Sequence, residues 1–162
     1  MKVLLLFIAG FFAVLLQNTV FNVLAVAGGK PDFILIFIVF FAIFRGPIQG
    51  GLLGMGLGLL EDLIIGRFIG INALCKGFIG YLAGTLEKRL YKNNFLVPMV
   101  ALVAATFVQT FLYWLLSCLI GSVVGLDKML LVAIPDSIYN MCFAPIIYAI
   151  FYHINQKNKD QE

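Results

Sequence analysis

The stretch that decides the fold is GPIQGGLLGMGLGLLEDLIIG, residues 46–66. Glycine occupies every fourth position along it: Gly46, Gly50, Gly54 and Gly58. The next step of four brings an acidic residue, Asp62. On an α-helix, positions four apart lie one above the other with a drift of about 40° per step, so the row predicts a slanting groove without side chains. Between helices in lipid, small residues at this spacing let two backbones pack closely. We therefore expect a second helix in this groove.

The spacing does not say whose helix that is. A neighbouring helix of the same chain is the commoner partner for such a row, and a helix of another protein is the alternative. A phosphate-binding loop is excluded, because these glycines lie inside an apolar segment and lack the strand and the Lys-Ser/Thr pair that such a loop needs.

The composition places the chain in a membrane. Of the 162 residues 62% are hydrophobic and 12% are charged, and the mean hydropathy is +1.05. A chain of this kind cannot cover itself with polar surface, so its outer surface must face lipid. The formal net charge is only +3, and the basic residues lie mostly at the ends of apolar segments. A nucleic-acid partner is therefore not expected.

Apolar runs predict an all-α polytopic membrane protein, a bundle of six helices in one integral domain. A membrane-spanning helix needs about 20 apolar residues. The candidate spans are residues 3–26, 32–44, 47–65, 69–86, 95–120 and 129–152. The second is short, and joining it to the third would give a helix of about 50 Å, too long for a bilayer. We therefore expect a hairpin of two short helices, separated at Arg45-Gly46-Pro47.

Charged residues at the segment ends predict the orientation. With both termini cytoplasmic, the inner side receives seven basic residues: Lys2, Arg45, Lys88, Arg89, Lys92, Lys157 and Lys159. The outer side receives Lys30, Arg67 and Lys128, which agrees with the positive-inside rule. A cleaved signal peptide ending near Ala25-Val26-Ala27 is the alternative interpretation of the N-terminus, but the apolar run is long for one.

The fourth span repeats the spacing of the third. Asn72, Lys76, Gly80 and Gly84 are also four apart. Across the turn between the two spans, Asp62 and Lys76 fall at similar depth, and a charge in lipid needs a partner. We expect either an ion pair between these two side chains or a Lys76 that extends alone to the headgroups.

Other polar residues inside the spans favour packing over catalysis. In the last span Pro135 and Pro145 remove backbone donors on either side of Asn140, which predicts a bend there. The three cysteines are isolated in apolar segments, and no pattern of His, Cys and carboxylates indicates a metal site, a cofactor site or a nucleophile. We expect no enzymatic activity.

Several of these residues together carry a resemblance to a family. They are Gln17-x-Thr19, Pro31-Asp32 before the hairpin, Arg45-Gly46 with the glycine row and Asp62-Leu63, then Gly70, Gly80-Tyr81 and Gly84, and finally Pro135, Asn140 and Pro145. Over nearly its whole length the chain resembles the bacterial rod-shape-determining protein MreD. The resemblance departs from the pattern at Glu61, an extra acid, and at Lys76, where an apolar residue is expected.

The resemblance implies a non-enzymatic scaffold of the cell-elongation machinery in the bacterial cytoplasmic membrane. Its implied partners are MreC, the filament protein MreB and the wall synthase formed by RodA and a penicillin-binding protein. The glycine row with Asp62 and the Pro135–Pro145 helix are the implied architectural positions, and Lys88, Arg89 and Lys92 would contact the cytoplasmic side or anionic lipid. The layout is also similar to the six-helix substrate-binding subunits of energy-coupling-factor vitamin importers, so such an importer subunit, with a polar ligand pocket in its outer half, is the rival hypothesis.

Overall fold

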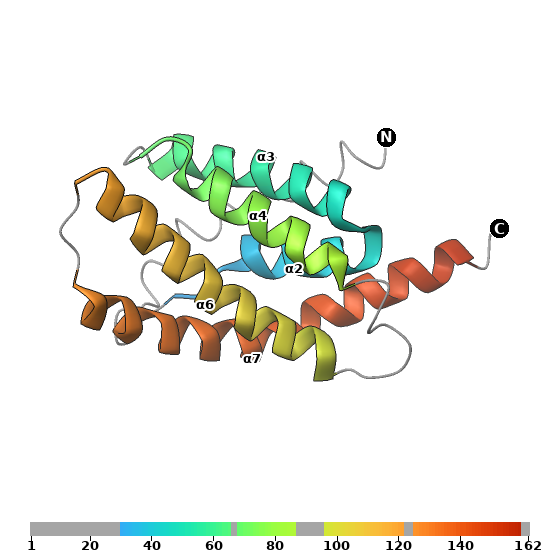
Figure 1. Ribbon diagram of the computed structural model, residues 1–162. Helices are drawn as coiled ribbons and strands as arrows, with labels where there is room; N and C mark the ends of the chain where they lie inside the picture. Colours follow the sequence, from blue (N-terminus) through green and yellow to red (C-terminus); the bar gives the residue numbers. More distant parts are fainter. Residues whose placement is uncertain (1–29, 66–67, 87–95, 122–124, 160–162) are drawn as a thin grey trace.

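Five α-helices make up the part of the chain that the computed structural model describes, which is residues 30–65, 68–86, 96–121 and 125–159 (Figure 1). They are α2 (Phe33–Arg45), α3 (Pro47–Ile65), α4 (Ile71–Thr85), α6 (Leu96–Leu119) and α7 (Leu126–Lys159). No strand occurs in these residues. The all-α prediction is confirmed for them, whereas they contain five helices and not the six of the predicted bundle. The first predicted span, residues 3–26, lies outside the described part.

The helix bounds follow the apolar runs closely. The third predicted span coincides with α3, and the second, fourth and fifth differ from their helices by one or two residues. The last helix is the exception, because α7 has 34 residues and extends beyond the apolar run at both ends. Polar residues at the C-terminal end of α7 therefore continue a helix that hydropathy alone ends earlier.

The predicted hairpin of two short helices is present. Asp32 caps the start of α2, because its side chain accepts a hydrogen bond from the backbone N–H of Leu35 at 2.8 Å. Gly46 ends α2 with a φ of 94°, a left-handed value that a residue with a side chain rarely adopts. Pro47 then begins α3 directly, as proline does in a first helical turn.

The centre of the bundle is α2. Nine of the ten residues from Ile34 to Ile43 are buried, and Phe37 is the exception. This burial is expected for a helix that is apolar on all sides. The other helices surround it: α3, α4, α6 and α7 each pack against α2, and α3 also packs on α4, α4 on α6, and α6 on α7. Figure 1 shows α3 and α7 on opposite sides of α2.

The glycine row of α3 packs against α4. A Cβ atom on Gly54 would overlap the backbone carbonyl of Lys76, and one on Gly58 would lie 2.5 Å from the carbonyl oxygen of Asn72. The glycines of α4 meet α3 in return, because a Cβ on Gly80 would overlap the backbone of Gly50. The groove is thus filled by a helix of the same chain, which confirms the first of the two alternatives.

The ends of the two rows complete this contact. A Cβ on Gly84 would overlap the backbone of Pro47 and would lie 2.5 Å from the carbonyl carbon of Gly46. All six glycines of the two predicted rows therefore serve either the α3–α4 contact or the turn that precedes it. Close approach of two backbones is the physical reason for the missing side chains.

Three described helices are long and apolar enough to cross a membrane, by length and composition. They cover Pro47–Ile65, Pro98–Leu119 and Leu131–Ala149. α2 is apolar but shorter, and α4 has 15 residues and carries Lys76. Large apolar side chains are exposed on α3, α4, α6 and α7, as expected for faces that contact lipid.

Candidate functional site

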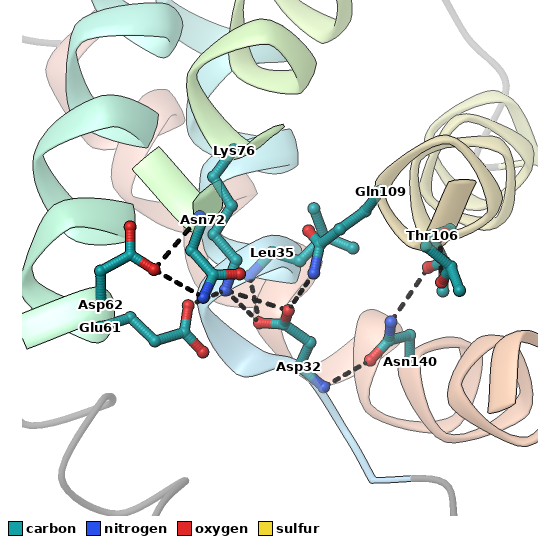
Figure 2. A network of polar contacts seen from close by, with 10 residues as sticks. Asp32, Leu35, Glu61, Asp62, Asn72, Lys76, Thr106, Gln109 and Asn140 are labelled. Carbon is teal, nitrogen blue, oxygen red and sulfur yellow. Dashed lines mark hydrogen bonds and ion pairs between the residues drawn. The ribbon is translucent and has the colours of Figure 1, made fainter. Parts of the chain in front are cut away.

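Polar side chains from all five described helices meet at the N-terminal end of α2 (Figure 2). We call this group the Asp32 cluster; its members are Asp32, Glu61, Lys76, Gln109 and Asn140. Asp32 is placed there by its capping role, Glu61 by α3, Lys76 by α4, Gln109 by α6 and Asn140 by α7. Ionisable residues inside a membrane protein are costly and tend to mark functional sites. The Asp32 cluster is therefore the candidate functional site.

Lys76 is the centre of charge in the cluster. Its ammonium group lies 3.0 Å from one carboxylate oxygen of Asp32 and 3.1 Å from the other, and it forms a second ion pair with Glu61. The Lys76 side chain has no solvent exposure, and those of Asp32 and Glu61 are 15% and 6% exposed. Lys76 thus links α4 to both α2 and α3, and its charge is paired inside the bundle, which excludes a Lys76 that extends alone to the surface.

Hydrogen bonds extend the cluster to α6 and α7. The amide of Gln109 donates to the Asp32 carboxylate at 2.7 Å, and the backbone N–H of Asp32 donates to the side-chain oxygen of Asn140 at 2.8 Å. The amide of Asn140 in turn donates to the hydroxyl of Thr106 at 3.0 Å. Asp32 therefore holds contacts to α4, α6 and α7 in addition to the start of its own helix.

Asp62 belongs to a separate group. Its carboxylate accepts from the backbone N–H groups of Gly70, Asn72 and Ala73 at 2.8–3.2 Å and from the amide of Asn72 at 2.9 Å. These N–H groups lie at the N-terminal end of α4, and the first N–H groups of a helix have no hydrogen-bond partner within the helix. Asp62 thus caps α4 from the preceding helix.

The expected ion pair between Asp62 and Lys76 is therefore wrong. Neighbouring positions on a helix point about 100° apart. This rotation turns Glu61 toward α2 and Lys76, while Asp62 points toward the turn before α4. The correct pair could have been found from the two departures from the family pattern, Glu61 and Lys76. An extra acid and a lysine that both fall in apolar spans are expected to pair. In the sequence Asp32 stands out only as part of the Pro31-Asp32 pattern, because its contact with Lys76 depends on the fold.

The two carboxylates and one ammonium of the cluster are chemically suited to holding helices together. Desolvation of such charges is repaid only where the geometry is good and hydrogen bonds satisfy the remaining atoms. In the described part of the chain, the side-chain oxygen of Gln109 is the buried side-chain polar atom without a hydrogen bond. No group of three or more His, Cys, Asp or Glu residues in that part has the arrangement of a metal site.

The remaining predicted residues lie around this site or beyond the described part. On α7, Asp136 accepts from the backbone N–H of Lys30 at 2.7 Å, one turn from Asn140. Pro135 and Pro145 lie inside α7, which continues as a helix through both. The basic residues Lys88, Arg89 and Lys92 lie outside the described residues.

Replacing Asp62 with alanine is expected to lower the free energy of unfolding by about 1–2 kcal/mol, because the first N–H groups of α4 lose their acceptor. Asp62→Asn keeps an acceptor oxygen and is expected to lose less. The measurement is thermal denaturation of the purified protein in detergent. Equal melting temperatures for Asp62→Ala and the unchanged protein would contradict the capping role.

Replacing Asn140 with leucine is expected to cost about 1–3 kcal/mol of stability, because the backbone N–H of Asp32 is then buried without an acceptor. Ile138→Leu, on the same helix at a side chain that is 60% exposed, is the control and is expected to change little. Thermal denaturation compares the two variants. A loss as large in Ile138→Leu as in Asn140→Leu would show that the effect is not specific to this hydrogen bond.

The fold and the cluster together define a class: a helical membrane protein in which a buried lysine of α4 forms ion pairs inside the bundle with carboxylates at the start of α2 and on α3. The chain belongs to the MreD family of rod shape-determining proteins, whose family model matches residues 1–158. No curated protein and no solved structure gave a significant match. Membership supports a role in rod-shape determination, and the likeness to importer subunits has no support among solved structures.

Proposed function

We propose that this protein is a non-enzymatic scaffold of the cell-elongation complex in the bacterial cytoplasmic membrane. Family membership supports a role in rod shape, and the family is described by that role and not by a reaction. The Asp32 cluster carries the proposal, because its polar groups bind one another across five helices and so make the bundle rigid. A rigid bundle with apolar outer faces is suited to holding other membrane helices in place.

The proposed partners come from the family resemblance. They are MreC, and beyond it MreB and the wall synthase of RodA with a penicillin-binding protein. Exposed apolar side chains on α3, α4, α6 and α7 offer several faces to transmembrane helices of such partners. Six spans with both termini in the cytoplasm would place Lys88, Arg89 and Lys92 on the side where MreB and anionic lipid are found.

Depletion of the protein in its native bacterium tests the proposal. Rod-shaped cells are expected to become round within a few generations, because wall synthesis loses its elongation machinery. Expression of the unchanged protein should restore the rods, and a variant with a disrupted Asp32 cluster should not. Normal shape combined with a growth defect that a vitamin corrects would overturn the proposal in favour of the importer hypothesis.

Co-purification tests the partners separately. An affinity-tagged protein solubilised in mild detergent is expected to retain MreC, and an unrelated tagged membrane protein at matched expression is the control. Absence of MreC from the purified complex, with normal rescue of cell shape by the tagged protein, would contradict MreC as a direct partner and leave the role in shape intact.

A further inference from the structure

The exposed face of the α3–α4 hairpin is apolar along its length. On α3 a row of large apolar side chains, each between 43% and 71% exposed, runs from one end of the helix to the other: Ile48, Leu52, Met55, Leu59 and Leu63. On α4, which lies beside α3 (Figure 1), Leu74 and Phe78 are 58% and 50% exposed. The charged residues of these two helices, Glu61, Asp62 and Lys76, are buried. A face whose helices turn their charges inward is suited to contact with acyl chains.

Polar side chains mark the edge of this face near the α2–α3 turn. Gln49 on α3 is exposed, and Tyr81 on α4 is 51% exposed. The two lie at similar height, because a Cβ on Gly51 would come within 3.5 Å of the Cβ of Tyr81. Tyrosine is enriched where a membrane meets water. We therefore expect the headgroup region at the level of Gln49 and Tyr81, on the cytoplasmic side in the predicted orientation.

The opposite edge of the face lies at the end of α3. Ile65 is the last residue of this helix, and Gly66-Arg67 follow it in the sequence. The backbone N–H of Gly70 donates to Asp62, so by that residue the chain has returned below the end of α3. Sixteen steps of about 1.5 Å separate Gln49 from Ile65, so the face is about 24 Å high. A tilt of the hairpin would only lower this height across the membrane.

A face of this height is shorter than the hydrocarbon core of a typical bilayer, which is about 30 Å thick. The candidate span of α6, Pro98–Leu119, has 22 residues and extends for about 33 Å. The exposed side chains of α6, among them Val100 and Phe111, are apolar up to Leu119. The α6 side of the bundle therefore matches an ordinary bilayer, whereas the α3–α4 side is too short by about 6 Å.

We propose that acyl chains occupy the α3–α4 face and that the bilayer is locally thinner there. A bilayer adapts to a short apolar face by thinning, at a modest cost per ångström. The alternatives are flanking side chains that extend to the headgroups and a second protein that covers the face. Thinning is favoured at the Gln49 edge, because glutamine lacks the length with which lysine and arginine extend to the headgroups. The proposal does not depend on the partners proposed above.

Cysteine reactivity in proteoliposomes of the purified protein tests this proposal. In a background with Cys75, Cys118 and Cys142 changed to alanine, Gln49→Cys and Ile65→Cys mark the two edges of the face, and Leu59→Cys marks its interior. The lipid is a phosphatidylcholine that forms a hydrocarbon core of about 30 Å, and a charged maleimide is present on both sides of the bilayer. The thiolate is the reactive form of cysteine, so a thiol in hydrocarbon does not react.

Two positions on α6 provide the matched control. Ala104 and Leu119 are both exposed, and their separation of fifteen positions is close to that of Gln49 and Ile65. Because the candidate span of α6 begins at Pro98, Ala104 lies about 9 Å inside it. Leu119→Cys is therefore expected to react, and Ala104→Cys is expected not to react.

We expect Gln49→Cys and Ile65→Cys both to react at least about tenfold faster than Leu59→Cys. Reaction at one edge alone, with the other edge reacting only in detergent, would show a bilayer of ordinary thickness and would overturn the proposal. Protection of both edges in the bilayer would show that a second copy covers the face, which would also overturn it. Rapid reaction of Ala104→Cys would do the same, because the bilayer would then be thin all around the bundle.

Discussion

Replacing Lys76 with methionine is expected to abolish accumulation of the folded protein. The change leaves the carboxylates of Asp32 and Glu61 buried together without the ammonium group that both contact. Removing one partner of a buried ion pair costs about 3–5 kcal/mol, which is a large part of the total stability of an ordinary domain. Membrane fractions analysed by quantitative immunoblotting and detergent-solubilised protein analysed by size-exclusion chromatography provide the measurement.

Charge neutralisation gives the sharpest control for this prediction. A triple variant with Asp32→Asn, Glu61→Gln and Lys76→Met carries no charge at these three positions and is expected to recover accumulation, because asparagine can still cap α2. Arg45→Met, at an exposed cation, is expected to change stability by less than about 0.5 kcal/mol. Normal accumulation of Lys76→Met alone would show that the ion pairs contribute little to the fold.

Replacing Gly54 with leucine is expected to separate α3 from α4 and to prevent assembly of the bundle. Even a single Cβ at this position would lie 2.7 Å from the carbonyl carbon of Lys76, and backbone atoms cannot move aside as a flexible side chain does. Gly54→Ala is expected to cost about 1–3 kcal/mol, the usual range for overpacking, and leucine more. Thermal denaturation of the alanine variant and accumulation of the leucine variant are the measurements.

Gly51 supplies the matched control on the same helix. A Cβ on Gly51 would meet its nearest neighbours, the carbonyl oxygen of Gly77 and the Cβ of Tyr81, at 3.5 Å, which is ordinary contact. Alanine favours a helix over glycine by about 1 kcal/mol, so Gly51→Ala is expected to leave stability unchanged or to raise it. Equal destabilisation by Gly51→Ala and Gly54→Ala would mean that the effect comes from the helix itself and not from the contact with α4.

Hydropathy and spacing were sufficient to predict the bounds of the described helices to within one or two residues, except for α7, which extends beyond its apolar run at both ends. The bounds of α3 match the predicted span because Pro47 is suited to the first turn of a helix and because the apolar run of the sequence is interrupted after Ile65 by Gly66-Arg67. The glycine row was informative because spacing along a helix fixes which residues share a face, whatever lies opposite. Gly46 and Pro47 at the α2–α3 turn were informative for a similarly local reason, because the backbone angles that they allow end one helix and begin the next.

The pairing of charges could not be predicted in this way. Asp62 and Lys76 lie at similar depth along their helices. Glu61, one position earlier on α3, nevertheless faces Lys76, and Asp62 faces the start of α4. The contact between Asp32 and Lys76 joins residues 44 positions apart, and it arises because α2 is the central helix of the bundle. The spacing of residues within one helix cannot predict such a contact between two helices.

The sequence by itself determined that this protein is helical and apolar, where α2, α3, α4 and α6 begin and end to within one or two residues, and which face of α3 has no side chains. These properties depend on residues within a few turns of one another, so local physical chemistry decides them. Only the tertiary structure decided that α4 fills the groove and that five helices meet at Asp32. Those contacts depend on how whole helices are arranged around α2, because a buried charge takes as its partner whichever opposite charge the packing brings within reach.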